Sequence, residues 1–150
     1  MLHVQIIQVG KTKDRFFADA ENEFLKRLSR YAKVQTDTID SDSKDSGDQK
    51  DEQEKIQKRM WKDSYKVVLE IKGKEFTSEE FAKFLEKSGE KGKVTFVIGG
   101  PHGLPKAVID QADLKFSMSR MTFTHRMIRV FLLEQIYRGF TILEGKTYHY

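Results

Sequence analysis

The segment Val94–Ile98 consists of five consecutive apolar or β-branched residues, and it runs directly into a loop with Gly99, Gly100 and Gly103. A run of this length and branching is typical of a strand that is covered on both faces of a sheet. Sheets with helices on both faces bind their ligands outside the carboxyl ends of the strands. The glycine loop is therefore a candidate ligand site, although a tight turn before the helix expected after Pro105 explains the same residues.

The period of the apolar residues predicts that strands and helices alternate along the whole chain. Thr77-Ser-Glu-Glu80 has the spacing of a capping box and indicates a helix start, and Gly73 is expected to close the strand before it. Strands are expected at residues 2–9, 33–39, 65–71, 94–98 and 113–118, and helices at 14–31, in a segment ending near 63, at 78–88, after 105 and at 125–143. This order predicts a single α/β domain over residues 1–150, with a mostly parallel sheet and helices on both faces.

Charge is distributed unevenly along the chain. Seven residues between Asp40 and Glu54 are acidic, and the segment has few apolar residues, so it is expected to be a mobile acidic excursion at about 40–54 whose later half is helical. Without this segment the chain has 25 basic and 16 acidic residues. A basic body of this kind favours a polyanionic partner, with nucleic acid first among the candidates, although solubility alone also explains it.

Several classes of protein are disfavoured. The chain has no cysteine and four dispersed histidines, which argues against thiolate chemistry and against a metal site. The start lacks the features of a signal peptide, and no apolar run is long enough to cross a bilayer, so a cytoplasmic protein without membrane contact is expected. A nucleotide hydrolase has no support, because no glycine-rich loop is followed by Lys-Ser or Lys-Thr.

The expected last helix, residues 125–143, is apolar nearly all the way round. Part of that surface is expected to meet another chain, which predicts a homodimer through the C-terminal helix; a helix sunk in the domain's own core is the alternative. Arg126 and Arg129 fall in its first turn, where the helix dipole disfavours cations. Contact with a phosphate or carboxylate explains their position, as does solvation of Arg126 and a local ion pair of Arg129.

The last six residues contain two aromatic side chains beside a histidine. Tyr148 and Tyr150 flank His149, and aromatic rings with a basic neighbour can stack on unpaired bases. A frayed chain end is the other interpretation.

Eight segments along the chain form a recognisable set in a fixed order: Val9-Gly-Lys11, Leu69-Glu-Ile-Lys-Gly-Lys74, Phe96-Val-Ile-Gly-Gly-Pro-His-Gly-Leu104, Phe116-Ser-Met-Ser-Arg-Met-Thr-Phe123, His125, Arg129-Val130, Glu134-Gln-Ile-Tyr-Arg138 and Tyr148-His149. Together they resemble the RlmH (YbeA-like) ribosomal RNA methyltransferases of the SPOUT superfamily. The resemblance runs from end to end in order, with no single motif carrying it. Two positions depart from the pattern: Thr124 stands where many relatives have proline, and Tyr150 stands where many have a basic residue.

The resemblance implies an S-adenosylmethionine-dependent enzyme that methylates N3 of a pseudouridine in 23S rRNA of the large ribosomal subunit. It further implies action on assembled ribosomes as a homodimer and a C-terminal part threaded into a deep trefoil knot. The cofactor is then expected to lie in the knot. By the family's pattern it contacts Leu69, Gly99, Met118, Ser119, Arg120, Met121, Thr122 and Phe123.

The catalytic group stays open at this point. The N3 proton of pseudouridine must leave, either to a general base or with electrostatic stabilisation of the anion. His125, Arg129 and His149 are the catalytic candidates, and Arg126, Arg129, Tyr148 and His149 are the candidates for substrate binding. A basic domain that binds ribosomal RNA without catalysis is the main alternative function.

Overall fold

The computed structural model describes residues 1–40 and 49–148. Their strands and helices alternate from end to end: β1 Leu2–Val9, α1 Arg15–Leu28, β2 Ala32–Ile39, α2 Lys50–Arg59, β3 Tyr65–Glu75, α3 Ser78–Lys91, β4 Lys93–Ile98, α4 Lys106–Gln111, β5 Leu114–Ser117 and α5 His125–Leu143. The predicted order is confirmed. The part of the acidic excursion at 41–48 lies outside the described residues, and α2 already begins at Lys50.

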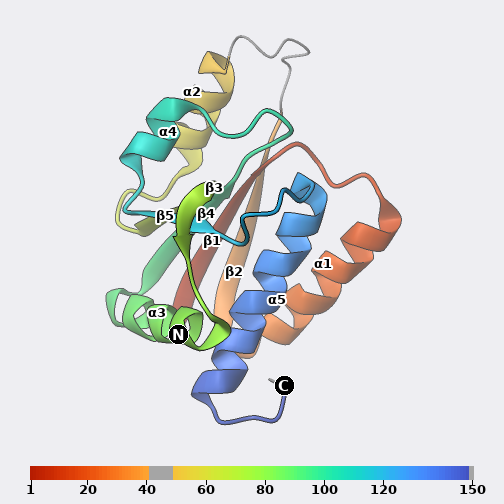
Figure 1. Cartoon of the computed structure of the whole chain (residues 1–150), viewed down its shortest axis with the longest axis vertical. Coiled ribbons are helices and arrows are strands. Elements are labelled where there is room, and N and C mark those ends of the chain that lie inside the picture. The colour runs from red at the N-terminus through yellow and green to blue at the C-terminus, as the bar shows by residue number, and fades with distance from the viewer. Residues whose placement is uncertain (41–48, 149–150) are drawn as a thin grey trace.

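The five strands form one sheet in the order β2-β1-β4-β3-β5, and the strand pairs along it are parallel (Figure 1). Helices α1, α3 and α5 cover one face, around a core that includes Val4, Phe96 and Leu132. Helices α2 and α4 cover the other face, around Ile7, Val97 and Val108. Helices on both faces were predicted, and this arrangement explains why Val94–Ile98 is buried throughout.

Two local predictions were wrong for reasons that lie far away in the sequence. The helix expected to end near Asp63 ends at Arg59, because the Trp61 N–H donates to Gln5 Oε1 at 3.1 Å instead of continuing the helical bonding. Gly73 does not close β3, which extends to Glu75. The strand bulges between Leu69 and Lys74, and at Gly73 the backbone comes so close to β5 that a Cβ would lie 2.6 Å from the Lys115 carbonyl.

Other local predictions are confirmed in atomic detail. The hydroxyl of Thr77 accepts from the Glu80 N–H at 3.1 Å while the Glu80 carboxylate accepts from the Thr77 N–H at 3.4 Å, which completes the capping box of α3. Gly92 then ends α3 in the left-handed conformation. Within the described ranges, no helix is long and apolar enough to cross a membrane.

Candidate functional site

A cleft of about 680 Å³ lies at the carboxyl ends of β4 and β5, beside the bulge of β3. Three stretches that are distant in the sequence form its walls: the middle of β3, the glycine loop after β4, and the segment from β5 into α5. Volume and position both suit a small-molecule ligand of an open α/β sheet. The lining residues are Leu69, Glu70, Ile71, Ile98, Gly99, Gly100, Pro101, Gly103, Leu104, Phe116, Met118, Ser119, Met121, Thr122, Phe123, Thr124, His125, Arg126 and Ile128.

The glycine loop forms its wall from bare backbone. It closes through a bond from the Gly103 N–H to the Gly100 carbonyl at 3.0 Å, and Gly103 has a φ of +75°, which favours glycine. A Cβ on Gly99 would lie 2.8 Å from the carbonyl carbon of Gly103, so the two sides of the loop pack backbone against backbone. Gln49, next to α2, donates to the Gly103 carbonyl at 3.1 Å and anchors the loop from outside.

The loop after β5 presents apolar side chains to the cleft and to solvent. Ser117 donates to the Ser119 carbonyl and Met121 N–H donates to the Ser119 hydroxyl, both at 3.0 Å, which fixes the path of the loop. The side chains of Met121 and Phe123 are 72% and 38% exposed. Arg120 points elsewhere: it donates to the Ile71 carbonyl and pairs with Glu75, each at 2.7 Å, and it does not line the cleft.

The first turn of α5 brings a histidine and a guanidinium to the cleft. Thr124 caps the helix by accepting from the Met127 N–H at 3.3 Å. Threonine in place of proline at this position therefore still starts the helix. Burial lowers the pKa of His125, and the guanidinium groups of Arg129 and Arg126 lower this pKa further. The imidazole is consequently neutral at pH 7 and can accept a proton. Arg126 forms an ion pair with Asp14 at 3.2 Å.

Arg129 has a different environment from Arg126. It is only 2% exposed and lies behind the cleft, where its guanidinium donates to the Val9 carbonyl and, at 2.9 Å, to the Thr12 hydroxyl. Thr12 in turn donates to the Glu21 carboxylate at 3.3 Å, which brings a negative charge near the buried cation. Arg129 therefore ties α5 to the end of β1, and it does not line the cleft.

The C-terminal segment folds back on α5 in its own chain. The Tyr148 ring packs against Tyr137, with centroids 4.8 Å apart, and the guanidinium of Arg138 lies 4.8 Å from its centroid. Tyr148 donates to the Glu134 carboxylate at 3.3 Å, and Glu134 also pairs with Arg138. Tyr148 is thus placed away from the cleft, and His149 lies outside the described residues.

Seven of the eight cofactor residues expected from the resemblance line one cleft, and Arg120 is the exception. Sequence reasoning missed several neighbours, among them Glu70 and Ile71 of β3 and Ile128 of α5. Glu70 and Ile71 end the strand predicted at 65–71, and Ile128 lies one helical turn after His125. These positions were the signal that could have placed them at the cleft. In the described part of the chain, no three acidic or histidine side chains gather closely enough to hold a metal ion.

Comparison with known proteins identifies relatives over the full length. A family model described as "Predicted SPOUT methyltransferase" matches residues 2–149. A protein of Methanococcus maripaludis is 44% identical over 99% of both chains. Two proteins named "Ribosomal RNA large subunit methyltransferase H" are similar: one from Carboxydothermus hydrogenoformans is 39% identical over 99% of both chains, and one from Caldicellulosiruptor saccharolyticus is 41% identical over 97% of this chain and 99% of its own.

Proposed function

Because the chain belongs to the SPOUT methyltransferase family, we propose that it methylates N3 of a pseudouridine in 23S rRNA of the large ribosomal subunit, with S-adenosylmethionine as methyl donor. Residues 1–150 then form one methyltransferase domain with the family's trefoil knot. It acts on assembled ribosomes in the cytoplasm as a homodimer. The observation that carries the proposal is the cleft at the carboxyl ends of β4 and β5, where the glycine loop and the loop at 118–124 meet.

The walls of the cleft fit this cofactor. Gly99 and Gly100 add main chain to the cleft wall, and the side chains of Leu69, Met121 and Phe123 offer apolar surface for an adenine ring. When bound, S-adenosylmethionine supplies a methyl group that is activated by a sulfonium. The chain's own task is to orient this group for in-line transfer and to exclude water.

Of the catalytic candidates, His125 has the best support. It lines the cleft, and its lowered pKa keeps the imidazole neutral and able to accept the N3 proton at a ring nitrogen. Arg126 lines the same cleft and is suited to stabilise the anion that forms when the proton leaves. Arg129 is proposed to act indirectly, because both terminal nitrogens of its guanidinium already have partners inside the protein.

Exposed apolar residues beside the cleft support the homodimer. Met121 and Phe123 stand at the cleft and Phe16 on α1 is 68% exposed, while Phe123 packs edge-on against Phe131 of α5 at 5.3 Å. Large apolar side chains gathered near a helix of mixed burial are typical of a protein interface. We therefore propose that a second copy covers α5 and the neighbouring loop.

The decisive test is mass spectrometry of 23S rRNA from cells without this gene, before and after its return on a plasmid. The proposal expects a methylpseudouridine that disappears and is restored by the wild-type protein, but not by His125→Ala. An unchanged nucleoside profile would reject the reaction. Calorimetry with S-adenosylmethionine separates this function from the binding module, because a module without catalysis has no reason to bind the cofactor even at millimolar concentration.

A further inference from the structure

The turn after α2 is fixed by a buried polar network that lies towards the amino ends of β3 and β4, away from the cleft. Gln5 of β1 is fully buried and uses all of its amide: Nε2 donates to Asp37 at 2.7 Å and to the Arg59 carbonyl at 2.8 Å, and Oε1 accepts from Trp61 N–H at 3.1 Å and Thr95 at 2.9 Å. A fully satisfied network of this kind specifies one geometry, because any displacement leaves buried polar atoms without partners.

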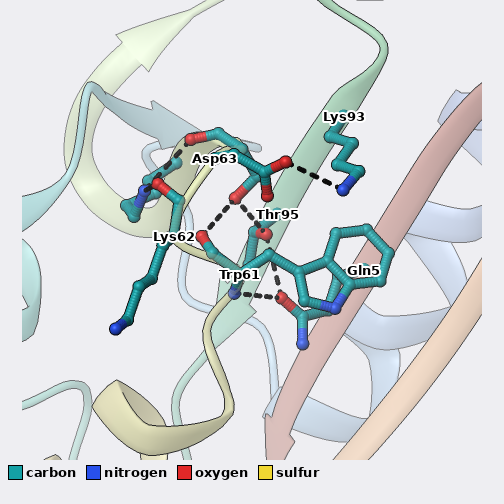
Figure 2. A network of polar contacts seen from close by, with 8 residues as sticks. Gln5, Trp61, Lys62, Asp63, Lys93 and Thr95 are labelled. Carbon is teal, nitrogen blue, oxygen red and sulfur yellow. Dashed lines mark hydrogen bonds and ion pairs between the residues drawn. The ribbon is translucent and has the colours of Figure 1, made fainter.

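The network holds one residue in particular. The Trp61 N–H is bound by Gln5, and its carbonyl accepts from the Ser64 hydroxyl at 2.9 Å. The Ser64 oxygen also lies 2.7 Å from the Thr95 hydroxyl, whose single proton goes either to Ser64 or to Gln5. Figure 2 shows these contacts meeting around the Trp61 main chain. The indole itself is half-buried, and its ring N–H has no protein partner within residues 1–40 and 49–148. A rigidly mounted indole with a free donor is suited to receive a ligand.

One cation lies over this indole, and three more belong to residues close to Trp61 in the chain. The Lys93 ammonium lies 5.9 Å from the ring centroid and pairs with Asp63 at 2.8 Å, and Lys66 donates to the carbonyls of Lys62 and Ser64. Lys62 is exposed, its side chain extends away from the network in Figure 2, and its ammonium has no partner among the described residues. Arg59 is also exposed, with a long contact of 3.8 Å to Asp37. Asp113 adds a third carboxylate by accepting from the Lys66 N–H at 2.8 Å, and four cations against three carboxylates leave this surface positive.

We propose that Trp61 and its cations form a second RNA contact, at which an unpaired nucleotide stacks on the indole while Lys62 and Arg59 meet the flanking phosphates. A positive surface with a fixed aromatic ring is the combination that binds single strands. We choose RNA over other polyanions as the ligand because the proposed substrate of the protein is an RNA. Lys93 beside the indole and Ile98 at the cleft lie at opposite ends of β4, about 17 Å apart at roughly 3.3 Å per residue, so one bound RNA can engage both.

The fluorescence of the full-length protein tests the contact directly, because the chain has a single tryptophan. An eight-nucleotide oligouridylate is expected to quench it saturably at low salt, without any cofactor. Lys62→Glu is expected to weaken binding about tenfold and to lower the slope of log K against log salt by about 0.7, the value for one phosphate on a single strand. Lys83→Glu is the matched control, because Lys83 is exposed on α3, which covers the other face of the sheet.

Inorganic polyphosphate separates stacking from simple charge attraction. It has the phosphates without the bases, so quenching equal to that by the RNA would overturn the proposal, as would equal affinities for Lys62→Glu and Lys83→Glu. Trp61→Phe keeps an aromatic ring and serves, with labelled RNA and polarisation, as the control for Trp61→Ala, which is expected to bind about tenfold more weakly. Thermal unfolding of each variant verifies the fold.

Intact ribosomes decide between RNA and protein as the partner. If Trp61→Ala loses affinity for ribosomes but not for the RNA probe, the surface contacts a ribosomal protein and the RNA proposal is wrong. The quenching assay involves no methyl transfer. An absence of quenching would therefore overturn the RNA contact at Trp61 and leave the proposed methyl transfer untouched. Conversely, quenching that persists in a protein without transferase activity refutes the reaction and not the contact.

Discussion

Replacing Gly99 by alanine tests whether the cleft depends on backbone packing in the glycine loop. The added Cβ would lie 2.8 Å from the Gly103 carbonyl carbon, 3.0 Å from its oxygen and 3.0 Å from the Leu104 nitrogen. Ordinary contact begins near 3.4 Å, so one side of the loop must move by roughly half an ångström. The atoms in the way are main chain, so no side-chain rotation relieves the overlap.

The cost follows from two opposing terms. Overpacking of this kind destabilises by about 1–3 kcal/mol, whereas alanine restricts the unfolded chain and returns about 0.4–1 kcal/mol. The net loss of about 1–2 kcal/mol corresponds to a fall in Tm of roughly 2–8 °C for a chain of this size. Movement of the cleft wall is expected to weaken binding of the proposed cofactor, S-adenosylmethionine, about tenfold, which is about 1.4 kcal/mol.

Gly100→Ala is the matched control, because it lies next to Gly99 and lines the same cleft. Its Cβ would be tight only against the Val9 Cγ1, at 3.3 Å, which can shift by a small rotation, while the Val9 carbonyl oxygen at 3.8 Å is an ordinary contact. We expect a stability within about 0.5 kcal/mol of the wild type and cofactor affinity within about threefold. Calorimetry and thermal unfolding measure both variants. Equal Tm and equal Kd for the two alanines would refute the packing argument.

Three other changes test separate parts of the structure. Arg129→Met leaves the buried Val9 carbonyl without a partner and should lower the free energy of unfolding by about 1–3 kcal/mol in urea denaturation, and an unchanged midpoint would count against it. The pKa of His125, followed by NMR, should lie below 6.5 and should rise towards 6.5 in Arg126→Gln. The stability that His125 contributes is present above pH 6.5 and is lost as the pH falls through the pKa of the folded state. Thr77→Ala removes the cap of α3 and should cost about 1 kcal/mol, measured by thermal unfolding, whereas Thr77→Ser should cost much less.

Most of the element order was predictable because each element expresses its period locally. Val94–Ile98 is a buried run, and the sheet covers it on both faces as expected. The capping box at Thr77 and Glu80 satisfies its bonds within one helical turn, so it needs no distant residue. Features of this kind depend only on residues that are close in the sequence, so they can be predicted from the sequence alone.

The errors arose where a distant residue changes a local preference. Helix α2 ends at Arg59 because Gln5, 56 residues before Trp61, takes the N–H that the helix would have used. Strand β3 passes Gly73 because the main chain of Lys115 lies against it. Each is a tertiary contact that overrides a reasonable local rule, and periodicity contains no information about it.

Only part of the cleft could be predicted from the sequence. Its individual walls were visible as a glycine loop and a family motif, but their meeting place depends on the end of β1. Val9 contacts Arg129 of α5 through its carbonyl, and its side chain is the nearest neighbour that a Cβ on Gly100 would meet. Asp14 then pairs with Arg126 at the rim of the cleft. Residues 9–14 thus hold both walls of the cleft in place without lining it. Arg129, which the sequence suggested as a ligand contact, instead supports the cleft from behind.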